Sequence, residues 1–232
     1  MPVKKDPMIF LKRILPMILV VSFVLSGCGW WKQAPLPGAS PERLYQRGYE
    51  NYQEGRYKKS IESFQRLKEE YPLSQLAILA EMGIADAYFS DGEYGEAEAA
   101  YSDFINLHPT NENLPYALYQ LGICHYKQIP SIDRDQTETQ KARKEFEALL
   151  ARFPSSKFAF LAEKMLRECK QKLAEHEFYV GHFYFKQQQY TAALKRFETI
   201  ARQYQNVGLD YKVNYFIGET KRRLEQQAKP KK

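Results

Sequence analysis

The stretch GRYKKSIESFQRLKEEYP, at residues 55–72, decides the fold because it recurs as GEYGEAEAAYSDFINLHP at residues 92–109. Six positions keep their character, each displaced by 37 residues: Gly55, Tyr57, Ser60, Phe64, Leu67 and Pro72 correspond to Gly92, Tyr94, Ala97, Tyr101, Phe104 and Pro109. A fixed period of this length is typical of repeat proteins, in which each unit buries its apolar face only against its neighbours. The sequence therefore predicts a stack of similar helical units.

Further copies of the pattern follow toward the end of the chain. They contain Gly122, Ala142, Phe146, Leu149 and Pro154, then Gly181, Tyr184, Tyr190, Ala193, Phe197 and Ile200, and finally a single helix around Gly218. These residues resemble the tetratricopeptide repeat, in which small residues let two antiparallel helices approach, an aromatic residue fills the space beside them and Pro ends the second helix. The expected fold is all-α, a superhelix of about five helical hairpins of which the last can be partial.

Departures from the period divide the repeats into two modules. Between Pro154 and Gly181 the spacing is long enough for one helix to run from about residue 157 to 186, and the turn of the third repeat carries eight extra residues, 129–136. We expect an amino-terminal module of repeats 1–3 at residues 41–155 and a carboxy-terminal module of repeats 4–5 at residues 156–228, followed by a basic tail at 229–232. Ser40 and Pro41 form a helix-start pattern, with Ser as the cap and Pro at the first helical position.

The amino terminus has the pattern of an export signal. Four bases precede the apolar run from Ile14 to Leu25, and twelve helical residues cover only about 18 Å of a hydrocarbon core that is roughly 30 Å thick. We therefore interpret residues 1–27 as a signal peptide rather than a membrane-spanning helix. Residues 28–40, which contain two prolines and show no period, are expected to form a tether.

The signal ends in Leu25-Ser26-Gly27-Cys28, which resembles the lipobox of bacterial lipoproteins. By that resemblance Cys28 carries diacylglycerol and an N-acyl chain, and more than one chain is needed for stable anchoring. The alternative is a cleaved signal with an unmodified cysteine. Residue 29 is Gly and not the Asp that retains such proteins in the inner membrane, so the resemblance implies the periplasmic face of the outer membrane. No other cofactor and no metal is expected.

The charge of the chain argues against nucleic-acid binding. Removal of residues 1–27 lowers the net charge from +6 to +3, and three lysines near the carboxy terminus account for the remainder. A near-neutral body lacks the basic patch that nucleic acid requires. Cys124 and Cys169 lie in expected helices without paired spacing, so buried small hydrophobic residues are favoured over a disulfide, which the sequence leaves open.

The first helices of the repeats supply a candidate binding surface. In a tetratricopeptide superhelix the concave groove is lined by fixed positions of these helices, and a groove rich in Tyr suits an extended peptide because rigid aromatics offer area and a polar tip at low entropy cost. The alternative is that about half of these side chains pack between repeats. The candidates are Tyr45, Tyr49, Tyr52, Met82, Asp86, Phe89, Tyr116, Tyr119 and Tyr126.

Several features together resemble the BamD family of lipoproteins, which serve the outer-membrane β-barrel assembly (BAM) machine. They are the lipobox, the repeats, the long helix, and the segments Tyr71-Pro72-Leu73-Ser74, Phe153-Pro154-Ser155-Ser156, Asp133-Arg134-Asp135-Gln136 and Leu173–Tyr179. The resemblance implies a non-catalytic scaffold and receptor for the carboxy-terminal peptides of unfolded outer-membrane proteins. Its implied partners are a β-barrel subunit similar to BamA, bound through periplasmic domains, and other lipoproteins of the machine.

The resemblance also implies a docking face in the carboxy-terminal module. Arg196 matches a basic residue implicated in contact with the β-barrel subunit, and Arg222 and Arg223 lie on the last helix; a solvated helix face is the alternative. A different role remains open at this stage, namely a repeat lipoprotein that scaffolds pilus secretion or the cell-wall and division machinery. Catalysis is not expected, because the four histidines show no metal-ligand spacing and no phosphate loop or nucleophile motif appears.

Overall fold

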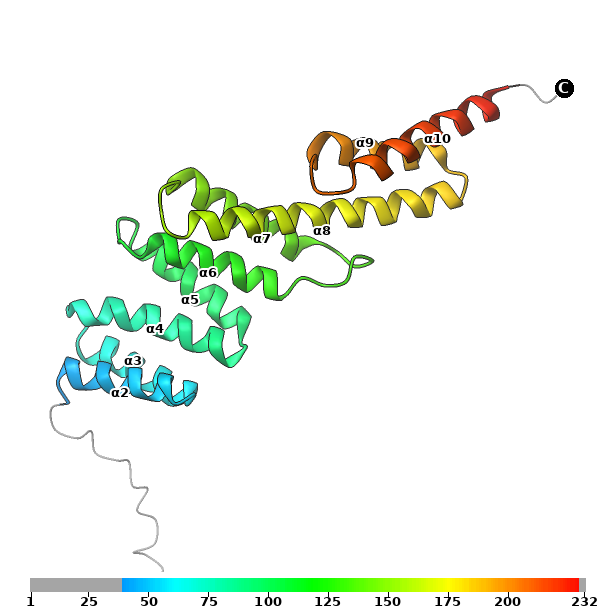
Figure 1. The fold of residues 1–232 in the computed structure, drawn as a ribbon. Coiled ribbons are helices and arrows are strands. Elements are labelled where there is room, and N and C mark those ends of the chain that lie inside the picture. Colours follow the sequence, from blue (N-terminus) through cyan, green and yellow to red (C-terminus); the bar gives the residue numbers. More distant parts are fainter. Residues whose placement is uncertain (1–38, 230–232) are drawn as a thin grey trace, which may run out of the picture. The chain divides into compact units, whose positions relative to one another are not determined.

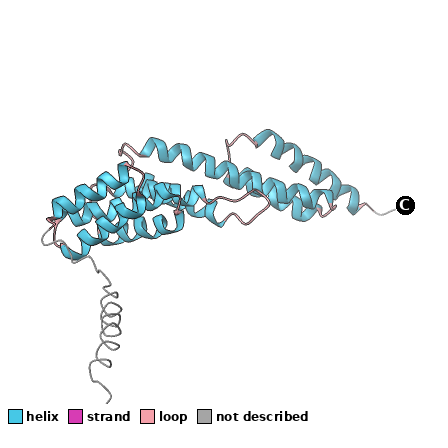
Figure 2. Ribbon diagram, turned by 90° about the horizontal axis from the view of Figure 1, so that it is seen from below, coloured by secondary structure: helices cyan, strands magenta, loops and turns pink. Residues whose placement is uncertain are grey.

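A computed structural model of the chain describes residues 39–229. Within these residues the structure consists of nine α-helices and no strands (Figures 1 and 2). The helices are α2 (Pro41–Gln53), α3 (Tyr57–Glu70), α4 (Gln75–Asp91), α5 (Tyr94–Leu107), α6 (Leu114–Lys127), α7 (Thr137–Arg152), α8 (Ala159–Lys186), α9 (Tyr190–Gln203) and α10 (Asp210–Ala228).

The helices pair in sequence order. Each helix from α3 to α9 packs against the one before it and the one after it. The pairs α2–α3, α4–α5, α6–α7 and α8–α9 are the hairpins of four repeats, and α10 packs on α9 as the single helix of a fifth (Figure 1). The predicted all-α repeat superhelix, with a partial last unit, is therefore confirmed.

The small and aromatic positions of the repeat meet in the first and third hairpins as the motif requires. A Cβ atom added to Gly48 would lie 2.5 Å from the ring of Phe64, and one added to Gly122 would lie 2.6 Å from the ring of Phe146. A carbon this close cannot be accommodated without moving the ring. The glycines thus let each aromatic ring lie against the backbone of the facing helix, which brings the two helices of a hairpin together.

The turns between paired helices use a left-handed residue at one repeated position. Gly55 and Gly92 have φ values of 71° and 82°, and in the fourth repeat Gln188 takes the equivalent place with φ of 59°. Glycine adopts this conformation without a steric penalty, whereas a residue with a Cβ does not. The fourth hairpin therefore keeps the turn geometry of the first two at a cost in stability.

The third hairpin is joined by the longer turn that the sequence predicts, at residues 128–136. Gln136 organises it, because its buried side chain donates through Nε2 to the carbonyl oxygens of Ser131 (3.0 Å) and Arg134 (3.1 Å) and accepts from Thr139 Oγ1 (2.7 Å). Ile132 in the same turn accepts a hydrogen bond from His176 Nδ1 on α8 at 2.6 Å. The turn is thus tied to the long helix.

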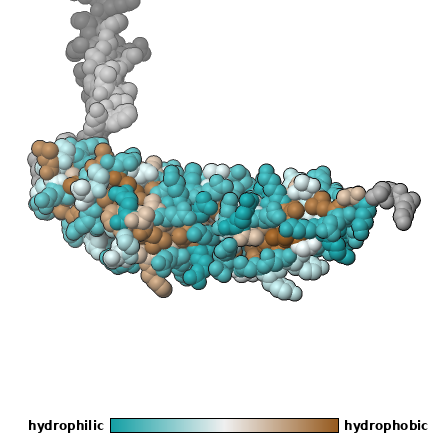
Figure 3. Space-filling view, turned by 90° about the horizontal axis from the view of Figure 1, so that it is seen from above, coloured by the Kyte–Doolittle hydropathy of each residue, from teal (hydrophilic) through white to brown (hydrophobic). Residues whose placement is uncertain are grey.

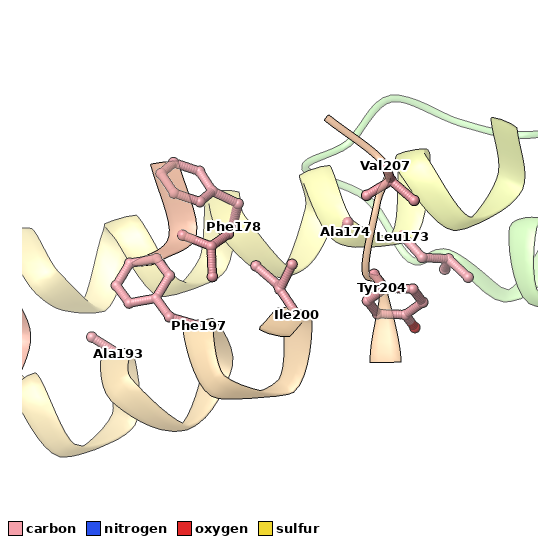
Figure 4. Packing of buried hydrophobic residues seen from close by; sticks show 9 residues of the cluster. Leu173, Ala174, Phe178, Ala193, Phe197, Ile200, Tyr204 and Val207 are labelled. Atoms are coloured by element: carbon pink, nitrogen blue, oxygen red, sulfur yellow. The ribbon is translucent and has the colours of Figure 1, made fainter. Parts of the chain in front are cut away.

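Helix α8 has 28 residues and packs on α7 and on α9, so it contributes to two successive repeats. Toward its carboxy-terminal end it forms one wall of a hydrophobic cluster that α9, the turn after it and α10 complete. Figure 4 shows Ala193, Phe197 and Ile200 of α9 facing α8 in this cluster. The other buried members are Leu173, Ala174, Phe178, Tyr204, Val207 and Val213.

Several sequence expectations concern residues 1–38 and 230–232, which lie outside the described residues. They include the signal peptide, Cys28 and most of the tether. Among the described helices, none is both long and apolar enough to cross a bilayer. At the domain start, Ser40 Oγ accepts from the Arg43 amide at 3.4 Å and Pro41 begins α2, which confirms the expected helix start. Cys124 and Cys169 are free and fully buried, which confirms the prediction that they are buried small hydrophobic residues and not a disulfide.

Candidate peptide-binding groove

The first helices of repeats one to three, α2, α4 and α6, together with α3, enclose an open cavity of about 250 Å³. Residues from segments more than 70 positions apart meet in it, because neighbouring repeats present their first helices side by side. Its lining residues are Tyr45, Tyr49, Tyr52, Phe64, Leu79, Met82, Gly83, Asp86, Asn113 and Tyr116.

Six of the nine predicted groove residues line this cavity, and three do not. Phe89 packs edge-on against Tyr94, with ring centroids 5.4 Å apart, and Tyr119 stacks on Phe158 at 5.7 Å. Tyr126 donates a hydrogen bond to Glu168 on α8 at 2.6 Å. Phe89, Tyr119 and Tyr126 thus make contacts within or between repeats. The residues that the structure brings together in the cavity are Tyr45, Tyr49, Tyr52, Met82, Asp86 and Tyr116.

The carboxylate of Asp86 lies in this cavity and is held by two tyrosines. The hydroxyl groups of Tyr101 and Tyr116 both donate to Asp86 Oδ1, at 2.5 and 2.7 Å, and Gln120 Nε2 donates to the Tyr116 hydroxyl at 3.1 Å. Burial raises the pKa of Asp86, and the two hydrogen bonds oppose that rise by stabilising the charged form. Burial and the nearby Asp86 also raise the pKa of Tyr116, so its hydroxyl stays protonated as a donor.

The side chains at the rim of the groove offer apolar surface, and the tyrosines among them end in a polar hydroxyl group. Tyr49 and Leu79 are exposed by 48% and 40%, while Tyr45 packs on Phe64 with ring centroids 5.6 Å apart. The Tyr52 hydroxyl and Ser90 Oγ share a hydrogen bond of 3.0 Å. Figure 3 shows hydrophobic patches among hydrophilic side chains on one face of the molecule. The groove itself, which is largely apolar with a few polar groups at fixed places, suits a peptide in extended conformation.

Four lining residues were absent from the set of nine candidates: Phe64, Leu79, Gly83 and Asn113. Phe64 is the aromatic of the first repeat, so the periodicity indicates a core role, but the residue also lines the cavity. Gly83 is one residue from a predicted position and lies against the same ring. Asn113 precedes α6 in a turn whose conformation the repeat pattern does not specify. The sequence carries a usable signal for Gly83 and for Leu79, which occupies one of the fixed positions of the first helix of repeat two.

Comparison with known proteins decides the family. The YfiO model, described as "Outer membrane lipoprotein", matches residues 37–231. The chain belongs to the YfiO family of outer membrane lipoproteins. It is 31% identical over 195 residues to an outer membrane protein assembly factor BamD of Rickettsia prowazekii, covering 84% of this chain and 78% of that one. It is 27% identical to a BamD of Caulobacter vibrioides, covering 71% of this chain and 54% of that one.

The expected family is therefore confirmed for this YfiO-family chain, and an outer membrane protein assembly role is favoured over the pilus and cell-wall alternative. Among solved structures, a tetratricopeptide repeat protein from Parabacteroides merdae is similar at 15% identity and a TM-score of 0.43, covering 81% of this chain and 77% of that one. The tetratricopeptide architecture is evident from the pairing of the helices themselves.

Each arginine that the sequence predicts as a docking residue forms an ion pair with a glutamate of the same module. Arg196 on α9 places Nη1 3.1 and 3.0 Å from the two carboxylate oxygens of Glu177 on α8. Arg222 and Arg223 both bind Glu219 on α10, at 2.6 and 2.8 Å. The three arginine side chains are 40 to 59% exposed. In the YfiO-family fold these cations are held in position while their outer faces stay accessible.

One cluster of potential ligands comes together that sequence spacing did not indicate. Glu98 of α5, His125 of α6 and Glu138 of α7 each place a ligand atom within 4.8 Å of the others. Lys141 Nζ lies 3.0 Å from Glu138 and 3.8 Å from Glu98, and His125 Nδ1 lies 2.8 Å from Glu138. With the Lys141 ammonium among them, the four side chains form a network of hydrogen bonds and ion pairs that joins α5, α6 and α7.

Proposed function

We propose that this chain is a non-catalytic subunit of the β-barrel assembly machine, which receives unfolded outer-membrane proteins and supports their insertion. The observation that carries the proposal is the tyrosine-lined groove across the first three repeats of a YfiO-family chain. The YfiO-family relatives named above are outer membrane protein assembly factors.

The groove supplies the chemistry that a receptor for unfolded β-barrels needs. Such chains are rich in aromatic residues and are extended before they fold, so a long apolar surface with polar tips can bind many of them with modest affinity. Tyr45, Tyr49 and Tyr52 lie along one helix at spacings of three and four residues, which presents them on one face. Tyr116 faces them from the third repeat.

The carboxy-terminal module would dock the periplasmic domains of a β-barrel subunit similar to BamA. Arg196, Arg222 and Arg223 are its candidate contacts, because each presents an exposed guanidinium that an acid on the other side orients. Arg forms paired hydrogen bonds with carboxylates, so it suits a polar interface of this kind. Other lipoproteins of the machine are further candidate partners.

The anchor would be a lipid on Cys28, holding the receptor on the periplasmic face of the outer membrane. Substitution of Cys28 by Ala is the direct test of this part. We expect Cys28→Ala to leave the repeats folded and the groove competent, and to release the protein from the outer-membrane fraction. Retention of the variant in that fraction would contradict lipid anchoring.

Depletion of the protein tests the function as a whole. We expect the levels of many outer-membrane β-barrels to fall together, and purification of the complex in mild detergent to recover a large β-barrel protein with periplasmic domains. Re-expression of the wild-type chain should restore both readouts. Normal barrel levels combined with a defect in pili or division would favour the alternative scaffold role.

A further inference from the structure

Asp86 presents one carboxylate oxygen, Oδ2, to which none of the described residues donates a hydrogen bond. Both tyrosine hydroxyl groups that reach this carboxylate donate to Oδ1, at 2.5 Å from Tyr101 and 2.7 Å from Tyr116. Within residues 39–229 no hydrogen bond is made to Oδ2. Asp86 lines the cavity and its side chain is only partly accessible. Among the described residues, Asp86 Oδ2 is not one of the buried polar atoms that lack a partner, so water reaches it in the cavity and a ligand that supplies a donor can take the place of that water.

The remainder of the lining carries no positive charge. The ten described residues that border the cavity comprise aromatic, aliphatic and neutral polar residues besides Asp86, and none of them is Lys or Arg. A free terminal carboxylate would therefore lie in a partly desolvated cavity beside a fixed negative charge, with no cation to bind it. Like charges brought together in such a site repel strongly, which excludes ligands as effectively as a steric clash does.

We propose that the groove binds an internal, extended peptide segment whose Tyr or Trp side chain donates a hydrogen bond to Asp86 Oδ2, and that it rejects a free carboxy-terminal carboxylate. This inference rests on the proposed function as a receptor for unfolded chains and specifies which part of such a chain the groove accepts. Asp86 is then the residue that sets specificity, and the tyrosines around it supply contact area.

The geometry of the cavity fits one such side chain. At about 250 Å³ the cavity is smaller than a typical small-molecule pocket but has room for an aromatic side chain. The ring would lie among Tyr45, Met82 and Tyr116, where aromatic pairs and a thioether give favourable contacts. Its hydroxyl or indole N–H would then point toward Asp86.

Four fluorescein-labelled octapeptides test the inference with the folded chain from residue 28 onward. They share one sequence and end in either Tyr or Phe, each as the free acid and as the amide, so that only the donor and the charge differ. We expect the amides to bind about tenfold or more tightly than the free acids, and Tyr amide to bind about tenfold more tightly than Phe amide, as one hydrogen bond to a charged group implies.

Asp86→Asn is the decisive variant, because its Oδ1 can still accept from both tyrosines while its amide nitrogen becomes a donor. We expect the variant to lose most of the preference for Tyr over Phe and to bind free acids better than wild type does. Glu168→Gln is the matched control. Glu168 also accepts a tyrosine hydroxyl, from Tyr126, but lies outside the cavity, so this variant should keep both preferences.

Two outcomes would overturn the inference in different ways. If wild type binds the free acids as tightly as the amides or more tightly, and Asp86→Asn changes nothing, the groove is a peptide site but its specificity is not set by Asp86. If none of the four peptides binds and none competes with an unfolded outer-membrane protein for the chain, the groove is not a receptor, and the proposed function loses its site as well.

Discussion

The ring of Phe146 lies so close to the backbone of Gly122 that a Cβ atom on the glycine would be 2.6 Å from it. The same relationship joins Gly181 to Phe197, at 2.8 Å, in the fourth repeat. These contacts set the distance between the paired helices, and hence the position of the first helices that form the groove. The stability of the repeats and the shape of the groove therefore depend on the same few contacts.

Substitution of Gly122 by Ala should destabilise the protein by about 1–3 kcal/mol, because the added methyl overpacks a filled core. Gly218→Ala is the matched control: this glycine is also helical, but nothing lies within 4 Å of its Cβ position. Alanine there should raise stability by roughly 0.5–1 kcal/mol. Urea unfolding of the two variants measures both effects, and equal changes would show that the close contact carries no cost.

Substitution of Gln188 by Gly should stabilise the protein by about 1 kcal/mol, because Gln188 has φ of 59° where the first two repeats use glycine. Its neighbour Gln187, with φ of −78°, provides the control. Gln187→Gly should give no gain, since glycine relieves no strain at that position. A thermal unfolding series compares the two, and a gain at Gln187 equal to that at Gln188 would contradict the explanation.

The pH dependence of stability should report on Asp86. Burial raises the pKa of this carboxyl above its usual value of 3.8, against the opposing effect of the hydrogen bonds from Tyr101 and Tyr116. A raised pKa in the folded state stabilises the protein below pH 3.8, and that stabilisation is lost as pH rises through the folded-state pKa. Asp86→Asn removes this dependence. We therefore subtract the free energy of unfolding of wild type from that of Asp86→Asn, and this difference should increase from acid to neutral pH. A difference that does not change with pH would refute a raised pKa of Asp86 in the folded state.

Substitution of Arg196 by Ala should separate docking from folding. Its ion pair with Glu177 is 40% exposed on the arginine side, so its loss should cost at most about 1 kcal/mol of stability. We expect recovery of the β-barrel subunit with the purified protein to fall several-fold. Lys221→Ala removes another exposed cation of the same module, which faces Glu198 at 3.6 Å, and should leave recovery unchanged. Equal recovery with both variants would argue against Arg196 as a contact.

The sequence predicted the fold well because repetition supplies independent copies of the same evidence. The displacement of Phe64 and Tyr101 by 37 residues identified the hairpin, and the run without Pro before Gly181 identified α8. The groove was predicted only in part. Position along a first helix cannot distinguish Tyr116, which lines the cavity, from Tyr119 and Tyr126, because the neighbours that cover the latter two come from α8 and the segment before it.

Other features depend on contacts between repeats that no local pattern encodes. The pairing of Tyr101 and Tyr116 on a single oxygen of Asp86 brings three helices together, and the periodicity indicated only that Tyr101 belongs to the core. Likewise Glu98, His125 and Glu138 show no ligand spacing in the sequence and meet only through the stacking of α5, α6 and α7. The repeat pattern predicts which helices stack but not which polar tips meet.

Photocrosslinking from the groove tests the central claim most directly. A photoreactive amino acid at Tyr49, which lines the cavity and is 48% exposed, should crosslink to unfolded outer-membrane proteins during their assembly. The same probe at Tyr211, which is 89% exposed on α10, is the control and should give no such product. Crosslinks at Tyr49 that are lost with an excess of Tyr-amide peptide would support the account. Absence of crosslinks at Tyr49, or equal yields at both positions, would contradict it.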